Sequence, residues 1–145
     1  MQEKIFYKVY LNSNYTNKCE IYNFIADLVN VEKNEKLQLE IVEKLEEREK
    51  KGGILVAESV ILPHFESSKV KKSGLIFIKP NKIIKRWNNN IGNVELIIVI
   101  LLRENEGEEE KKEIRDFVRK LADDSYVEQL KQIKNTEIFY QKIKK

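Results

Sequence analysis

Leu96–Leu102 reads LIIVILL, and this stretch decides the fold. Its apolar residues do not alternate with polar ones, so a strand formed here has no face suited to water. A strand that is buried on both faces is typical of the centre of a sheet covered by helices on each side. The stretch therefore predicts an α/β fold in which a mixed β-sheet is sandwiched between helical layers.

Outward from this run, the neighbouring apolar segments are short and are separated by polar turns, which favours further strands. An aromatic and β-branched segment near the start of the chain has the same character. We expect strands at Ile5–Leu11, Ile54–Val56, Val60–Leu62, Leu75–Ile78 and Ile83–Ile84, with the central strand extending over Val94–Leu102.

Two helices are predicted between the first strand and the strand block. Asn17 can cap the first, in which apolar residues recur at spacings of three and four. Asn34 can cap the second, where Leu37, Ile41 and Leu45 repeat every four residues. Gly52-Gly53 is a typical helix terminator, so we expect the second helix to end there.

The chain after the central strand is predicted to be helical. A third helix is expected to bury one face of Ile114–Leu121. Ser125 and Glu128 have the spacing of a capping box for a fourth helix, and a short last helix is expected at Glu137–Lys142.

Composition narrows the classes of function. The length of 145 residues suits one domain, residues 1–145, and 27 basic against 24 acidic residues give no strong nucleic-acid signal.

No apolar run approaches the roughly 20 residues of a membrane span, and Met1–Lys4 lacks the pattern of a signal peptide, so we expect a cytoplasmic protein. With one cysteine and one histidine, neither an internal disulfide nor a structural zinc site is expected.

The single histidine, His64, is the first candidate for chemistry, because imidazole titrates near neutral pH. Pro63 restricts its own backbone and that of Leu62, so we expect the apolar strand to run into a stiff turn that presents His64 at a sheet end. The alternative is a histidine with an ordinary structural hydrogen bond and no catalytic role.

Arg48 is the second candidate. A helical arginine usually forms a local ion pair, but the residues three and four positions from Arg48 include no carboxylate. Its guanidinium is therefore available for another anion, and a planar fork of donors suits phosphate oxygens well. The alternative is an ordinary solvated arginine.

Other chemical sites fit the sequence less well. Gly52-Gly53 lacks the spacing and the following Lys-Ser or Lys-Thr of a phosphate-cradling loop, and no serine lies in a nucleophile motif. The acidic run Glu104–Glu110 is interpreted as solvated surface, and Trp87 as a packing residue.

The segment from Arg48 to His64 resembles the type-2 enzyme IIA family, the fructose and mannitol branch of the bacterial sugar phosphotransferase system. The residues that stand in the register of the family pattern are Arg48-Glu49, Gly52, Val60-Ile61-Leu62 and Pro63-His64. The similarity extends over nearly the whole chain, from the opening strand to the helical close.

This resemblance implies a mixed sheet flanked by helices and a role as a phosphotransferase in sugar uptake. His64 would accept a phosphoryl group from the carrier HPr and pass it to an enzyme IIB, and Arg48 would bind the phosphoryl group. The resemblance implies no metal, no organic cofactor, no direct contact with nucleic acid and no membrane insertion.

The chain also departs from the family pattern. Gly53-Ile54-Leu55 stands where the family commonly has Ser-Thr-Gly, and the region Lys111–Ile114 offers no second histidine. Glu113–Ala122 is similar to the closing helices of IIA-like domains in sugar-operon regulators. An alternative function is therefore that of a regulatory domain, fused to or associated with a transcriptional antiterminator or activator that carries PTS-regulation domains, which senses phosphorylation.

Overall fold

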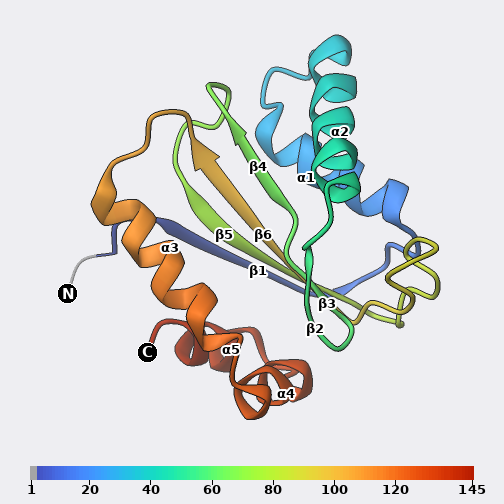
Figure 1. The fold of residues 1–145 in the computed structure, drawn as a ribbon, viewed down its shortest axis with the longest axis vertical. Helices are drawn as coiled ribbons and strands as arrows, with labels where there is room; N and C mark the ends of the chain where they lie inside the picture. The colour runs from blue at the N-terminus through green and yellow to red at the C-terminus, as the bar shows by residue number, and fades with distance from the viewer. Residues whose placement is uncertain (1–2) are drawn as a thin grey trace.

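The computed structural model describes residues 3–145; Met1 and Gln2, half of the stretch considered for a signal peptide, lie outside it. Strands and helices alternate along the described chain in blocks (Figure 1). Their bounds are β1 Phe6–Ser13, α1 Lys18–Val29, α2 Glu35–Lys50, β2 Leu55–Ala57, β3 Val60–Ile61, β4 His64–Ser67, β5 Gly74–Pro80, β6 Leu96–Arg103, α3 Glu108–Lys120, α4 Asp124–Gln132 and α5 Thr136–Ile143.

The strands of the described residues form one mixed, six-stranded sheet in the order β1-β5-β6-β3-β2, with β4 also paired to β6. β5 runs antiparallel to β6, while β3 and β4 run parallel to it. β6 is thus the central strand, as LIIVILL predicted, and Leu96 through Val99 have no measurable exposure.

The two faces of β6 explain why its sequence does not alternate. Its odd-numbered residues from 97 to 101 pack in the same core as α1 and α2. Its even-numbered residues from 96 to 100 pack in a second core with α3, α4 and α5. Figure 1 shows these two helical layers on opposite sides of the sheet. The predicted α/β sandwich is confirmed.

The predicted ends of the first two helices are also confirmed. The side chain of Asn17 accepts a hydrogen bond from the backbone N–H of Glu20 at 2.9 Å, and Asn34 accepts one from Leu37 at 3.0 Å. α2 ends at Lys50, and Gly52 follows with φ of +83°, a left-handed conformation that glycine adopts without steric penalty.

Two local predictions are wrong. Asp123, not Ser125, caps α4, because its carboxylate accepts hydrogen bonds from the N–H groups of Ser125 and Tyr126. Ile83–Ile84 forms no strand; Ile84 makes one isolated bridge to Val94 instead.

The prediction that His64 follows a turn at a sheet end is also wrong. Ile61 pairs with Ile97 and His64 pairs with Ile100, so the chain keeps one register along β6 through Pro63. Proline lacks only an N–H, and the carbonyl of Pro63 still accepts from Ile100 N–H at 2.9 Å. His64 therefore lies beside the middle of the central strand, at the start of an unpredicted strand, β4.

Candidate functional site

His64 lies where the α3 side of the sheet meets the exposed edge of β4. In a parallel ladder, paired residues point to the same face, so His64 shares the α3 face with Ile100. Two surface cavities, of about 370 Å³ and about 280 Å³, are each lined in part by His64. The imidazole is thus accessible from two neighbouring hollows that are built by different helices.

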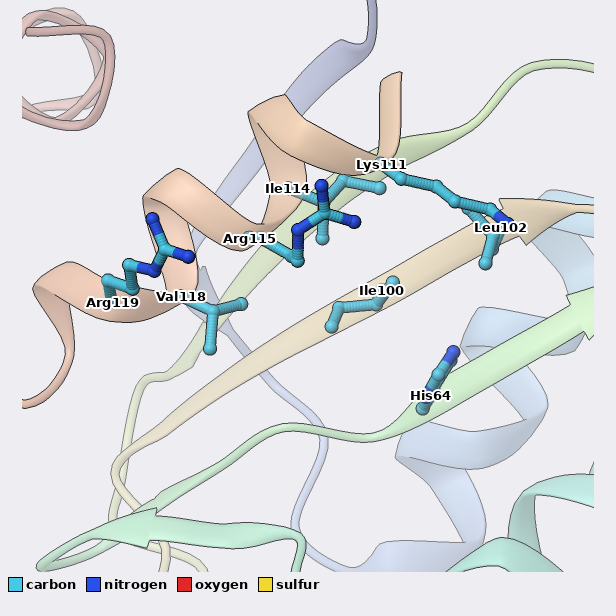
Figure 2. Close-up of a pocket in the computed structure, with 8 residues that line it drawn as sticks. All are labelled: His64, Ile100, Leu102, Lys111, Ile114, Arg115, Val118 and Arg119. Atoms are coloured by element: carbon cyan, nitrogen blue, oxygen red, sulfur yellow. The ribbon is translucent and has the colours of Figure 1, made fainter. Parts of the chain in front are cut away.

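The larger cavity lies between β4, β6 and α3. Figure 2 shows His64 on β4 and, on the other side of β6, the basic residues of α3 that line the same cavity. The lining residues are His64, Ile100, Leu102, Lys111, Ile114, Arg115, Val118 and Arg119. Apolar walls of this kind exclude water from a reacting group once a partner covers them.

The smaller cavity lies between β4 and the last turns of α2, and it brings the two predicted site residues together. His64 and Arg48 both line it, although they are sixteen residues apart in the sequence. The other lining residues are Lys44, Glu47, Lys51, Phe65 and Glu66. Basic residues outnumber acidic ones here, so the cavity suits an anion.

A hydrogen bond to the backbone holds Arg48 in place. Its Nη1 donates to the carbonyl oxygen of Gly52 at 2.7 Å, and no carboxylate of residues 3–145 lies within ion-pairing distance of it. The glycine that ends the helix therefore also orients the guanidinium. Most of the donors of Arg48 remain available for another acceptor in the cavity.

The imidazole of His64 is favoured in its neutral form. Burial lowers the pKa of His64 below its ordinary value, the positive charge of Arg48 lowers it further, and Glu66 opposes the change. Its Nε2 atom is buried and has no hydrogen-bond partner among the described residues. A neutral, unpaired imidazole can act as a nucleophile.

The charges around His64 predict how its pKa responds to substitution of Arg48 and Glu66. The single histidine gives one set of imidazole resonances, and we expect an NMR pKa below 6.5 that rises in Arg48→Ala and falls further in Glu66→Gln. The pKa of His64 is lower in the folded state than in the unfolded state. Its contribution to the free energy of unfolding is therefore complete above pH 6.5 and is lost as the pH falls through the pKa of the folded state. A pKa above 6.5, or no response to either variant, would contradict this prediction.

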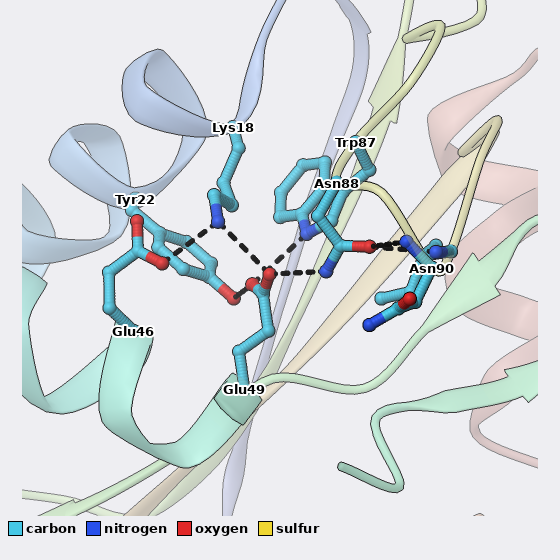
Figure 3. A network of polar contacts seen from close by, with 8 residues as sticks. Lys18, Tyr22, Glu46, Glu49, Trp87, Asn88 and Asn90 are labelled. Carbon is cyan, nitrogen blue, oxygen red and sulfur yellow. Dashed lines mark hydrogen bonds and ion pairs between the residues drawn. The ribbon is translucent and has the colours of Figure 1, made fainter. Parts of the chain in front are cut away.

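A buried polar network surrounds Glu49, the residue after Arg48, and it was not predicted from the sequence. Only 5% of the Glu49 side chain is exposed, and Figure 3 shows donors from two segments, α1 and the loop before β6, converging on its carboxylate. The donors are Tyr22 Oη at 2.5 Å, Asn88 Nδ2 at 2.6 Å, Lys18 Nζ at 3.0 Å and Trp87 Nε1 at 3.1 Å.

The network keeps Glu49 ionised. Burial raises the pKa of Glu49, but the hydrogen bonds from its four donors together outweigh burial and hold the pKa below the ordinary value. Trp87 packs edge-on against Tyr22, as a packing residue should, but its indole N–H also serves this carboxylate. Glu49 thereby joins α1, the end of α2 and the loop before β6.

The basic residues of α3 were also missed. Lys111, Arg115 and Arg119 are four residues apart, which places them on one stripe of a helix, but the sequence does not show that this stripe faces His64. The segment Lys111–Ile114 was noted only for its lack of a histidine.

Within residues 3–145, no group of three or more His, Cys, Asp or Glu side chains is placed to hold a metal ion. The described helices are each too short or too polar to cross a membrane.

The protein is an α/β domain in which one histidine and one arginine line the same cavity. Known structures share this fold. The nitrogen regulatory protein IIA-Ntr from Neisseria meningitidis superposes with a TM-score of 0.74 at 21% identity, over 93% of this chain and 92% of that one. IIA mannitol from Escherichia coli gives a TM-score of 0.65 at 22% identity, over 94% of this chain and 95% of that one.

A third similar structure is enzyme IIAMTL from Escherichia coli, solved in complex with phosphorylated enzyme IIBMTL. Its TM-score is 0.66 at 21% identity, over 95% of this chain and 98% of that one. Among curated proteins, multiphosphoryl transfer protein 1 of Escherichia coli K12 and the multiphosphoryl transfer protein of Shigella flexneri are each 25% identical over 122 residues, or 84% of this chain. The chain spans only 15% of the length of these relatives.

Residues 7–145 match the family model described as phosphoenolpyruvate-dependent sugar phosphotransferase system, EIIA 2. The match covers nearly the whole chain. The chain belongs to this family, as its resemblance to type-2 enzyme IIA predicted.

Proposed function

We propose that residues 1–145 form a single cytoplasmic IIA domain that carries a phosphoryl group on His64 during sugar uptake. The phosphocarrier HPr supplies the group, an enzyme IIB receives it, and Arg48 binds its oxygens. The observation that carries this proposal is the cavity that a neutral His64 shares with Arg48, which has no carboxylate partner among the described residues. Family membership and the IIA–IIB complex of the similar structure support it.

The uptake step is an exchange of one N–P bond for another. The lone pair of a His64 ring nitrogen attacks phosphorus as the bond to the donor's histidine breaks, and the electron pair of that bond returns to the donor. In transfer to IIB, a nucleophile of IIB bonds to phosphorus as the N–P bond of His64 breaks, and the electron pair of that bond returns to the imidazole. Arg48 stabilises the charge on the moving phosphoryl oxygens, and its fixed position avoids reorganisation during the reaction.

The direct test is incubation with enzyme I, HPr and phosphoenolpyruvate. We expect the protein to acquire one acid-labile phosphate per chain and to release it to IIB. A folded protein that acquires none would contradict the proposal and would favour a regulatory or purely binding role for the domain.

The role of Arg48 predicts a large rate effect. Arg48→Ala should slow phosphorylation about a hundredfold, on the order of 3 kcal/mol in the barrier, because a preorganised contact to the transferring group is lost. Arg48→Lys should recover part of the rate, since it keeps the charge without the bidentate fork.

Lys50→Ala is the matched control for Arg48→Ala, because Lys50 is an exposed basic residue of the same helix end and does not line the cavity. Quench-flow or gel-shift kinetics at fixed phospho-HPr measure the three variants. An unchanged rate in Arg48→Ala would remove this residue from the mechanism.

A further inference from the structure

Three basic residues of α3 border the larger cavity but stand apart from the pair proposed to handle the phosphoryl group. Lys111, Arg115 and Arg119 recur every four residues and line the cavity together with His64. Figure 2 shows all three on the helix side of the cavity, opposite the strand that carries His64. We call this set the α3 stripe. The whole chain has a formal charge of only +3, so this concentration of positive charge is local.

The α3 stripe is weakly neutralised by its own helix. Arg115 lies 3.4 Å from Glu108, and Arg119 lies 3.4 Å from Asp116; the arginine side chains are 51% and 77% exposed. Exposed pairs of this kind contribute little and are readily exchanged for other partners. Among the described residues, Lys111 has no carboxylate within 4.0 Å, and neither Glu108 nor Asp116 lines the cavity.

The wall beside the α3 stripe is apolar. Ile100, Leu102, Ile114 and Val118 form it, and His64 lies at its border. An apolar patch bordered by charges is typical of a protein docking surface, in which the patch excludes water and the charges select the partner.

We propose that the α3 stripe is the electrostatic part of the docking surface for IIB, and that the IIB surface that meets it is acidic. This inference rests on the proposed function and specifies its partner. A second group of basic residues, Lys44, Arg48 and Lys51, lines the α2 side of His64, so an acidic surface would approach a histidine that has positive charge on two sides. These charges also reduce repulsion between an acidic partner and the phosphorylated histidine.

The test compares two triple variants that lose the same charge. Lys111→Gln/Arg115→Gln/Arg119→Gln neutralises the α3 stripe with residues of good helix propensity. Lys36→Gln/Lys82→Gln/Lys85→Gln removes three exposed lysines that line neither cavity of the site. Each protein is phosphorylated to completion, and transfer to purified IIB from the same organism is then followed at 25, 75 and about 150 mM salt, a range over which screening becomes strong.

We expect neutralisation of the α3 stripe to lower kcat/KM for IIB at the lowest salt by about tenfold to a hundredfold, with kcat little changed. Wild-type kcat/KM should fall as salt rises, and the stripe variant should lose most of that dependence, while the control variant should behave as wild type.

Equal kcat/KM and equal salt dependence in wild type and stripe variant would overturn the inference. So would a wild-type rate that rises with salt, which indicates a basic partner, or a defect confined to uptake of phosphate from HPr. These outcomes all require that the wild type transfers phosphate. A wild type that transfers none would instead reject the proposed function itself.

Discussion

Glu49→Ala is expected to lower the free energy of unfolding by about 3–5 kcal/mol, one of the largest effects available to a single substitution in this chain. The change removes the shared acceptor of a buried network, in which Tyr22 Oη and Trp87 Nε1 are deeply enclosed. Unsatisfied buried donors retain their full desolvation cost, which exceeds the net value of the hydrogen bonds themselves. Urea denaturation followed by tryptophan fluorescence measures the effect, because Trp87 is the only tryptophan.

Glu46→Ala is the matched control. Glu46 lies on the same helix and also accepts from Lys18 Nζ, at 2.8 Å, but 35% of its side chain is exposed. We expect a loss of no more than about 1 kcal/mol, as for a surface pair. An equal loss of unfolding free energy in Glu49→Ala and Glu46→Ala would show that the burial and the additional donors of Glu49 do not stabilise the fold.

The ionised state of Glu49 adds a dependence on pH. Because the folded-state pKa is lowered from 4.5, the stabilisation is complete above that pH and is lost as the pH falls through the folded value. Glu49→Gln should be less stable than wild type at pH 7 and should lack this part of the acid sensitivity. A wild type and a Glu49→Gln variant with parallel stability curves below pH 5 would contradict the assignment.

His64→Ala is expected to abolish phosphate incorporation completely while leaving the fold intact. The chain contains one histidine, so no other imidazole can accept the group. The side chain makes no hydrogen bond to the described residues, and it lies on β4, which pairs only with β6; its removal should therefore cost little stability. Intact-protein mass spectrometry after incubation with the phosphoenolpyruvate-dependent donors measures incorporation.

The control for His64→Ala is its thermal unfolding midpoint, which should stay close to that of the wild type. His64→Gln, which keeps a polar side chain of similar reach, should be equally inactive. Acid-labile phosphate on either variant would place the acceptor elsewhere in the chain and would reject the site.

Part of the candidate site could be predicted because its residues carry local sequence signals or stand at the positions of a known family pattern. His64 stood out as the single histidine, and Arg48 as a helical arginine without a carboxylate at helical spacing. Asn17 and Asn34 identified their helices because a capping bond spans only three residues. The same reasoning failed at Pro63, where backbone preference predicted a turn and the ladder of β6 kept the strand in register.

The sequence by itself determined the layers of this protein. LIIVILL has no polar face, so it requires a strand with cover on both sides, and the helix patterns supply that cover. Tertiary structure alone decided which side chains meet. Glu49 contacts Tyr22, Trp87 and Asn88 across 27, 38 and 39 residues, and the α3 stripe faces His64 across the central strand. Such contacts depend on how packed elements lie relative to one another, and patterns with periods of two to four residues carry no information about that placement.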